Sequence, residues 1–100
     1  MEWPEIKALQ VGTLIKITNR LENTTEVEFG TIKYADTDNS GYFIVVEKAF
    51  IYDTNNNRKE MCFINTTIVR ITAKIVVEIM SNTQAAAYQK LVATINELTK

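Results

Sequence analysis

The 100-residue sequence contains no histidine and only one cysteine, and both scarcities limit its chemistry. Histidine is the side chain most often used as a general base or metal ligand near neutral pH, so both roles lack their usual candidate. Cys62 has no second cysteine with which to form an internal disulfide, which suits a reducing compartment. It lies in an apolar run with no histidine beside it, so we expect it to behave as a small core hydrophobe.

The sequence also lacks an excess of positive charge and a long apolar run. Its formal net charge is −1, whereas a general nucleic-acid binder needs a basic footprint; a small local basic patch is still compatible with this balance. There is no run of about eighteen apolar residues and no apolar segment behind the N-terminus. The sequence therefore predicts one soluble, intracellular domain, with 46% hydrophobic residues available for a core.

Two helices and five strands are predicted along the chain. Pro4 suits the first position of a short helix, and Gly12 ends that segment. β-Branched residues between turn signals predict strands at residues 13–19, 26–35, 42–52 and 59–64 and a fifth strand that starts at Ile68 and extends as far as Ile79. Gly30 predicts a bend or bulge in the second strand, and residues 65–67 are predicted as the tight connection before the fifth.

The C-terminal segment has the pattern of an amphipathic helix. Ser81 and Gln84 fit a capping box that opens a helix over about residues 82–98. Its apolar stripe consists of Tyr88, Leu91, Ile95 and Leu98. This stripe has two interpretations, since it could dock on a partner or cover the chain's own barrel.

The charged residues have simple structural interpretations. Asp36 and Asp38 favour a turn over a metal or acid–base pair. Glu26 and Glu28 alternate along one strand and are expected on its solvated face, and Lys7, Lys16 and Lys33 are expected to be ordinary surface lysines. With no phosphate-binding glycine loop and no nucleophile–base spacing, we expect no enzyme activity and assign no catalytic, cofactor-binding or metal-binding residue.

Two sets of residues resemble, in order and spacing, the two motifs of the Sm and Sm-like family. The first comprises Gly30-Thr31-Ile32, Asp36 and the apolar strand at residues 42–46, and the second closes with Ile68-Val69-Arg70-Ile71. The resemblance covers about residues 4–72. It implies an all-β fold, a small, strongly bent five-stranded Sm-like (SH3-like) barrel with a short N-terminal helix and a C-terminal helix. It also implies an Sm-like domain at 1–72 and a C-terminal strand extension and helix at 73–100.

The sequence departs from the RNA-binding members of this family at two places. Gly41 stands where the first motif has an asparagine, and Ile64-Asn65 is taken to stand where the second has Arg-Gly. Loss of a base-stacking arginine weakens the free energy of RNA binding by roughly 1–3 kcal/mol per base. These departures, together with Glu2-Trp3 ahead of the fold, are similar to those of the Gemin branch of Sm-like proteins.

The resemblance to the Gemin branch implies a non-catalytic scaffold role in the cytoplasm and nucleus. Such a subunit forms a heterodimer with another Sm-like Gemin, and a further Gemin links the pair to SMN, whose complex assembles Sm rings on spliceosomal small nuclear RNA. The alternative is an RNA-binding Sm-like ring subunit with a degenerate RNA pocket. We expect no cofactor, no membrane and no direct sequence-specific RNA binding. The expected protein-interface residues are Met61, Cys62, Phe63, Ile64, Ile68, Val69, Arg70, Ile71, Tyr88, Leu91, Ile95 and Leu98, with 61–64 and 68–71 as the two pairing edges.

Overall fold

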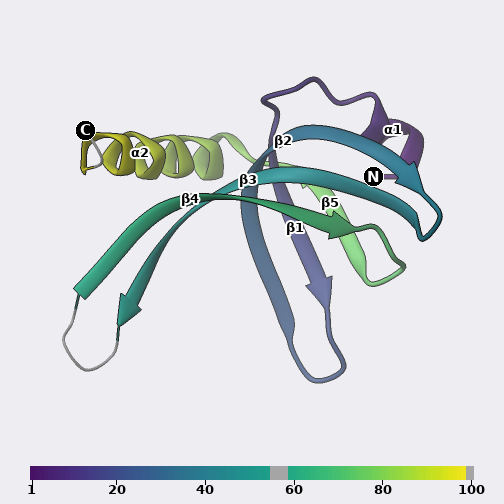
Figure 1. The fold of residues 1–100 in the computed structure, drawn as a ribbon, viewed down its shortest axis with the longest axis horizontal. Coiled ribbons are helices and arrows are strands. Elements are labelled where there is room, and N and C mark those ends of the chain that lie inside the picture. Colours follow the sequence, from purple (N-terminus) through teal and green to yellow (C-terminus); the bar gives the residue numbers. More distant parts are fainter. Residues whose placement is uncertain (55–58, 99–100) are drawn as a thin grey trace.

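The described part of the chain consists of five strands with a helix at each end (Figure 1). The computed structural model describes residues 1–54 and 59–98, with side chains for all of these except residues 50–54, 59–63 and 98. The elements are α1 (Trp3–Lys7), β1 (Leu14–Arg20), β2 (Thr25–Asp38), β3 (Gly41–Thr54), β4 (Lys59–Arg70), β5 (Ile75–Ile79) and α2 (Asn82–Leu98). The predicted fold class, all-β with two flanking helices, is confirmed.

The strands form one antiparallel sheet in the order β4-β3-β2-β1-β5. β5 follows β4 in the chain but returns to the far side of the sheet, where Ile79 and Val77 stand opposite the buried Ile15 and Ile17 of β1. This order leaves β4 and β5 at the two edges. The sheet curves strongly in Figure 1. Among the described strand pairs none joins β4 to β5, so closure into a barrel stays a prediction.

β4 is one continuous strand, where the sequence predicted two strands and a connection. Residues 65–67 pair with residues 46–48 of β3 in unbroken register. The chain turns instead at residues 71–74, and β5 begins at Ile75, within the same sheet. The predicted connection at 65–67 and the predicted start of the fifth strand at Ile68 are therefore wrong. Pairing with β3 holds Asn65 and Thr66 in the strand despite their turn-forming composition.

Gly30 lies where β2 passes very close to β3. A Cβ atom at this position would lie 2.8 Å from the backbone carbonyl oxygen of Glu47. Just beyond it, the β2–β3 register shifts between Ile32 and Tyr34, as at a β-bulge. The predicted irregularity of this strand is confirmed, and it lets the first half of β2 pair with β1 and the second half with β3.

Two hydrophobic clusters hold the sheet and helices together. The larger cluster consists of Ile6, Ile15, Ile17, Ile32, Ile44, Val46 and Val77, with Trp3, Leu9, Ala35, Val69, Ile71 and Ile75 packed against it. The smaller consists of Ala49, Met80, Tyr88 and Ile95, with Leu14, Phe29, Ala85, Leu91 and Val92 around it. Neighbouring residues of one strand fall in different clusters, for example Leu14 and Ile15. Because strand side chains alternate between faces, the two clusters lie on opposite faces of the curved sheet.

The N-terminal segment is fixed by an aromatic contact and a glycine turn. Trp3 stacks on Tyr42, with ring centroids 4.5 Å apart, which confirms that Trp3 packs against the body of the protein. Gly12 has φ +95°, a conformation that favours glycine, and its N–H donates to the carbonyl of Ile32 at 2.9 Å. This turn therefore leads the chain from α1 into β1.

The capping box predicted for α2 is confirmed. The backbone N–H of Gln84 donates to Ser81 Oγ at 3.2 Å, and the N–H of Ser81 donates to Gln84 Oε1 at 2.9 Å. The bounds of the helix, Asn82–Leu98, also agree with the prediction. Neither described helix has the length and apolar character that crossing a membrane requires.

Candidate functional site

The two pairing edges expected from the sequence lie on a single strand. Residues 61–64 and 68–70 all belong to β4, and Ile71 follows its last residue. The opposite edge is β5 (Ile75–Ile79), a separate strand and not the end of one long strand beginning at Ile68. The assignment of two separate edges to these segments is therefore wrong. The side chains of Met61, Cys62 and Phe63 lie outside the described residues.

The β4 edge residues divide between two faces of the sheet. Ile64 and Ile68 are exposed, with 40% and 61% of their surface accessible. Val69 and Ile71 instead pack against the larger core cluster. Among the described side chains of this edge, Ile64 and Ile68 are therefore the aliphatic ones that a partner could contact, and Val69 and Ile71 stabilise the fold.

The outward face of β4 continues as an apolar and aromatic surface across β3 and β2. Ile68 stands opposite Val45, which in turn stands opposite Tyr34. The Tyr34 ring meets the edge of Phe43 with centroids 6.3 Å apart, and the Arg70 guanidinium lies 5.3 Å from the centroid of the Phe43 ring. A partner strand on β4 would therefore border this surface.

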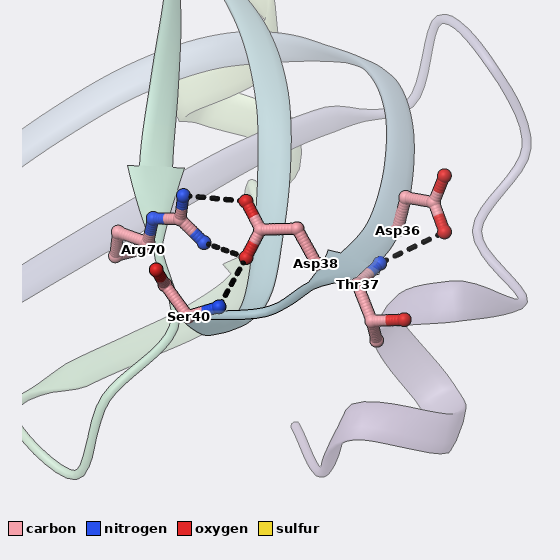
Figure 2. Close-up of polar contacts among 5 residues, drawn as sticks. All are labelled: Asp36, Thr37, Asp38, Ser40 and Arg70. Atoms are coloured by element: carbon pink, nitrogen blue, oxygen red, sulfur yellow. Dashed lines mark hydrogen bonds and ion pairs between the residues drawn. The ribbon is translucent and has the colours of Figure 1, made fainter.

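Arg70, at the end of β4, forms a two-point ion pair with Asp38 in the β2–β3 turn (Figure 2). Its Nη1 and Nη2 atoms donate to the two carboxylate oxygens of Asp38, each at 2.6 Å. Asp38 Oδ1 also accepts the backbone N–H of Ser40 at 2.8 Å. This arrangement joins β4 to the β2–β3 turn with the planar geometry that arginine and carboxylate share.

The position of Arg70 corrects the comparison of the second motif. That comparison placed Ile64-Asn65 just before the last strand, where the family has Arg-Gly. In the structure the last strand begins at Ile75, and Arg70 ends the preceding strand. The inference that an arginine is missing before the last strand is therefore wrong, because it depended on the predicted break at 65–67.

The ion pair changes the titration of both partners. Hydrogen bonds from Arg70 and then from the Ser40 backbone lower the pKa of Asp38 from 3.8 to about 2. The same contact with Asp38 raises the pKa of Arg70. Because the pKa of Asp38 is lower in the folded protein than in the unfolded chain, its contribution to stability is present above about pH 4 and is lost as the pH falls toward 2.

Asp38→Asn is expected to remove this acid-sensitive contribution. The free energies of unfolding of the wild type and the variant should differ most near neutral pH and converge between about pH 4 and pH 2, as Asp38 becomes protonated. Urea denaturation at several pH values measures this difference, and the remaining carboxylates are common to both proteins. A difference that stays constant down to pH 2 would contradict the assignment.

β5 provides the second edge. Ile79, 56% exposed, stands opposite the fully buried Ile15 of β1, and Glu78 beside it is exposed. β5 pairs with β1 on one side and is the last strand of the sheet on the other. The sequence contained the signal for this strand, since Ile75, Val77 and Ile79 are apolar residues at every second position. It did not reveal where the strand starts.

The apolar stripe of α2 covers the chain's own sheet. Tyr88 and Ile95 are buried in the smaller core cluster, and Leu91 packs against them. The Tyr88 hydroxyl accepts the N–H of Ala49 and donates to the carbonyl of Glu47, both at 3.2 Å. The stripe therefore covers the chain's own sheet, the second of the two interpretations: Tyr88 and Ile95 are core residues, and Leu91 is partly buried against them. The side chain of Leu98 lies outside the described residues.

The acidic residues form contacts within the fold. Asp38, the last residue of β2, accepts the N–H of Ser40 in the turn, so the turn interpretation is confirmed for Asp38 (Figure 2). It is wrong for Asp36, which pairs with Phe43 inside the strand and accepts the N–H of Thr37 at 2.8 Å. Glu26 is exposed as predicted. Glu28 is accessible over 43% of its side chain and forms an ion pair with Lys48 of β3, so the solvated-face interpretation holds for it only in part. Within the described residues no group of three histidine, cysteine or acidic residues could hold a metal ion.

Comparison with known protein families, curated proteins and solved structures found no match to this chain.

Proposed function

We propose that this chain is a non-catalytic scaffold subunit of an SMN-type complex that assembles Sm rings on spliceosomal small nuclear RNA in the cytoplasm and nucleus. It would act through an Sm-like heterodimer with another Gemin subunit, in the manner of the sixth Gemin, and a further Gemin would link the pair to SMN. The observation that carries the proposal is the pair of edge strands β4 and β5, each with an exposed isoleucine. The resemblance of residues 4–72 to Sm-like proteins supports the identity of the partners.

Edge strands are suited to pairing with a second sheet. The outer side of β4 has backbone N–H and C=O groups that a partner strand could bond, while Ile64 and Ile68 could provide side-chain specificity. An uncovered apolar edge also promotes aggregation, so a permanent partner would protect it. The proposal therefore assigns β4 as the main contact and β5 as the second.

The charge distribution supports a protein partner over RNA. The formal net charge is −1. Arg70 is paired at two points with Asp38 and lies over Phe43, so its guanidinium is already engaged. An RNA ligand would have to compete with that carboxylate for the guanidinium.

An RNA-binding Sm-like ring subunit is the second candidate, and one observation favours it. Arg70 precedes the connection to the last strand, next to the β2–β3 turn that carries Asp38. Native mass spectrometry of the chain, alone and co-expressed with Sm-like Gemin subunits, separates the two candidates. A stable one-to-one complex formed only with a partner supports the scaffold, whereas a closed six- or seven-membered ring of this chain alone supports the ring subunit.

Ile68→Glu is expected to weaken the heterodimer about tenfold or more, because it puts a charge in place of the most exposed described aliphatic side chain of β4. Leu21→Glu is the matched control, since Leu21 is also an exposed aliphatic residue but lies in the β1–β2 turn. Both variants should keep the wild-type circular dichroism spectrum. Titration calorimetry with the purified partner measures the affinity, and an unchanged affinity for Ile68→Glu would remove β4 from the interface.

A further inference from the structure

β2 and β3 diverge below their last described pair, Thr31↔Glu47. Beyond that point residues 25–30 pair with β1 and residues 48–54 pair with β4 (Figure 1). Among the described strand pairs, none joins these two stretches to each other. They are therefore two strand edges that face one another across a fork.

Cavities lie on both sides of this fork. The outer cavity has a volume of about 550 Å³ and is mainly apolar, lined by Val27, Phe29, Ala49, Ala87, Tyr88 and Leu91 among others. The inner one measures about 290 Å³ and includes Glu26, Thr67 and Arg70 in its lining. Glu28 and Lys48 line both cavities, so their ion pair lies between them. The outer volume is within the range of ordinary ligand pockets.

The backbone edge of β3 at this fork is already hydrogen-bonded to a side chain of α2. The Tyr88 hydroxyl of α2 bonds the carbonyl of Glu47 and the N–H of Ala49, the two groups that flank Lys48. The facing edge of β2, from Glu26 to Phe29, has no comparable contact among the described hydrogen bonds. Strand addition in this fork is therefore available on the β2 side once the Glu28–Lys48 ion pair, which joins the two edges, opens.

The charges at the inner cavity determine what such a strand should contain. Lys48 is paired with Glu28, and Arg70 is paired with Asp38. Glu26 lines the same cavity and has no ion pair among the described residues. The inner side of the fork therefore has one uncompensated negative charge, which complements a lysine or arginine.

We propose that the fork between β2 and β3 binds an extended peptide segment in which apolar and basic residues alternate. The segment adds to the edge of β2 at residues 26–29. Because strand side chains alternate between faces, its apolar residues enter the 550 Å³ cavity against Val27 and Leu91, while its basic residues face Glu26 on the inner side. The lining of its inner cavity includes Ile68 of β4 and Ile75 of β5, so the site borders both edge strands. Its backbone contacts lie on β2 and do not require the proposed heterodimer.

The probe is a short blocked peptide that alternates valine and lysine, titrated into the full chain by fluorescence anisotropy; a valine–glutamate peptide is the control. We expect the lysine peptide to bind more tightly and to slow hydrogen exchange of the amides at residues 26–29. Glu26→Lys should weaken the lysine peptide by roughly two- to fivefold and improve binding of the glutamate peptide.

Ala87→Trp tests the outer cavity. Ala87 is exposed and lines that cavity, so a tryptophan there should fill it and weaken binding about tenfold or more. Ala93→Trp is the control, because Ala93 is an exposed alanine of α2 outside the lining. Equal weakening by both variants would overturn the proposal.

Three other outcomes would also overturn the proposal. The first is that neither peptide binds, and the second is that both bind equally to the wild type. The third is protection at residues 26–29 in the chain alone at high concentration, which would assign the fork to a second copy of this chain. Failure of the peptide test would leave the β4-edge proposal standing, because Ile68→Glu tests that edge with a different ligand.

Discussion

Ile95→Ala is expected to lower the free energy of unfolding by about 2–5 kcal/mol, the usual range for truncating a buried isoleucine. Ile95 is 2% exposed and belongs to the smaller core cluster, which joins α2 to the sheet. Its truncation leaves a cavity between Tyr88 and the surrounding aliphatic side chains, because closely packed neighbours relax only partly. Urea denaturation followed by circular dichroism measures the loss.

Ile79→Ala is the matched control for Ile95→Ala. It deletes the same atoms from a side chain that is 56% exposed, so we expect a loss of at most about 1 kcal/mol. A loss for Ile95→Ala no greater than this would mean that α2 does not pack on the sheet through its Tyr88 and Ile95 face. That outcome would reopen the interpretation in which this stripe docks on a partner.

Gly30→Ala is expected to lower the free energy of unfolding by about 1–3 kcal/mol, as overpacking of a closely packed site usually does. The added Cβ would lie 2.8 Å from the carbonyl oxygen of Glu47, and this atom belongs to the backbone of β3. The strand must shift to make room, which weakens the adjacent Thr31↔Glu47 pair. Gly30→Val should cost more, because its two methyl groups enlarge the clash.

Gly12→Ala separates this clash from the general loss of glycine flexibility. A Cβ at Gly12 would meet nothing within 4 Å, so its cost comes from φ +95° alone. Hydrogen exchange measures the difference: Gly30→Ala should accelerate exchange of amides near Glu47, and Gly12→Ala should leave them unchanged. If both variants leave that exchange unchanged, the close approach of the two strands is not what requires glycine at position 30.

The divergence of β2 and β3 depends on the same crowded point. Gly30 brings the strands together at Glu47, and the ion pair between Glu28 and Lys48 follows directly below. Beyond this point the described pairs of β2 are with β1, and those of β3 are with β4. The fork between β2 and β3 is therefore a consequence of the bend that lets a small sheet curve around its core.

The amino-acid sequence by itself determined the elements whose signals are local. Pro4 and Gly12 bracket the N-terminal helix and its turn, Ser81 and Gln84 set the start of α2, and Gly30 marks the irregular part of β2. Apart from Gly30, whose close contact is with Glu47 of β3, each signal depends on a backbone conformation or hydrogen bond between residues close in the chain, so neighbouring residues contain the necessary information. Strand alternation likewise predicted an all-β protein.

Tertiary structure alone decided where β4 ends and which residues form the edges. Residues 65–67 have the composition of a turn, but pairing with β3 holds them in an extended strand. The Arg70 side chain is likewise positioned by its ion pair with Asp38, thirty-two residues away in the chain. Tyr88 is positioned by its hydrogen bonds to the backbone of β3. These contacts depend on which strands become neighbours, and pairing between distant segments can override local propensity because it buries far more surface than a turn can.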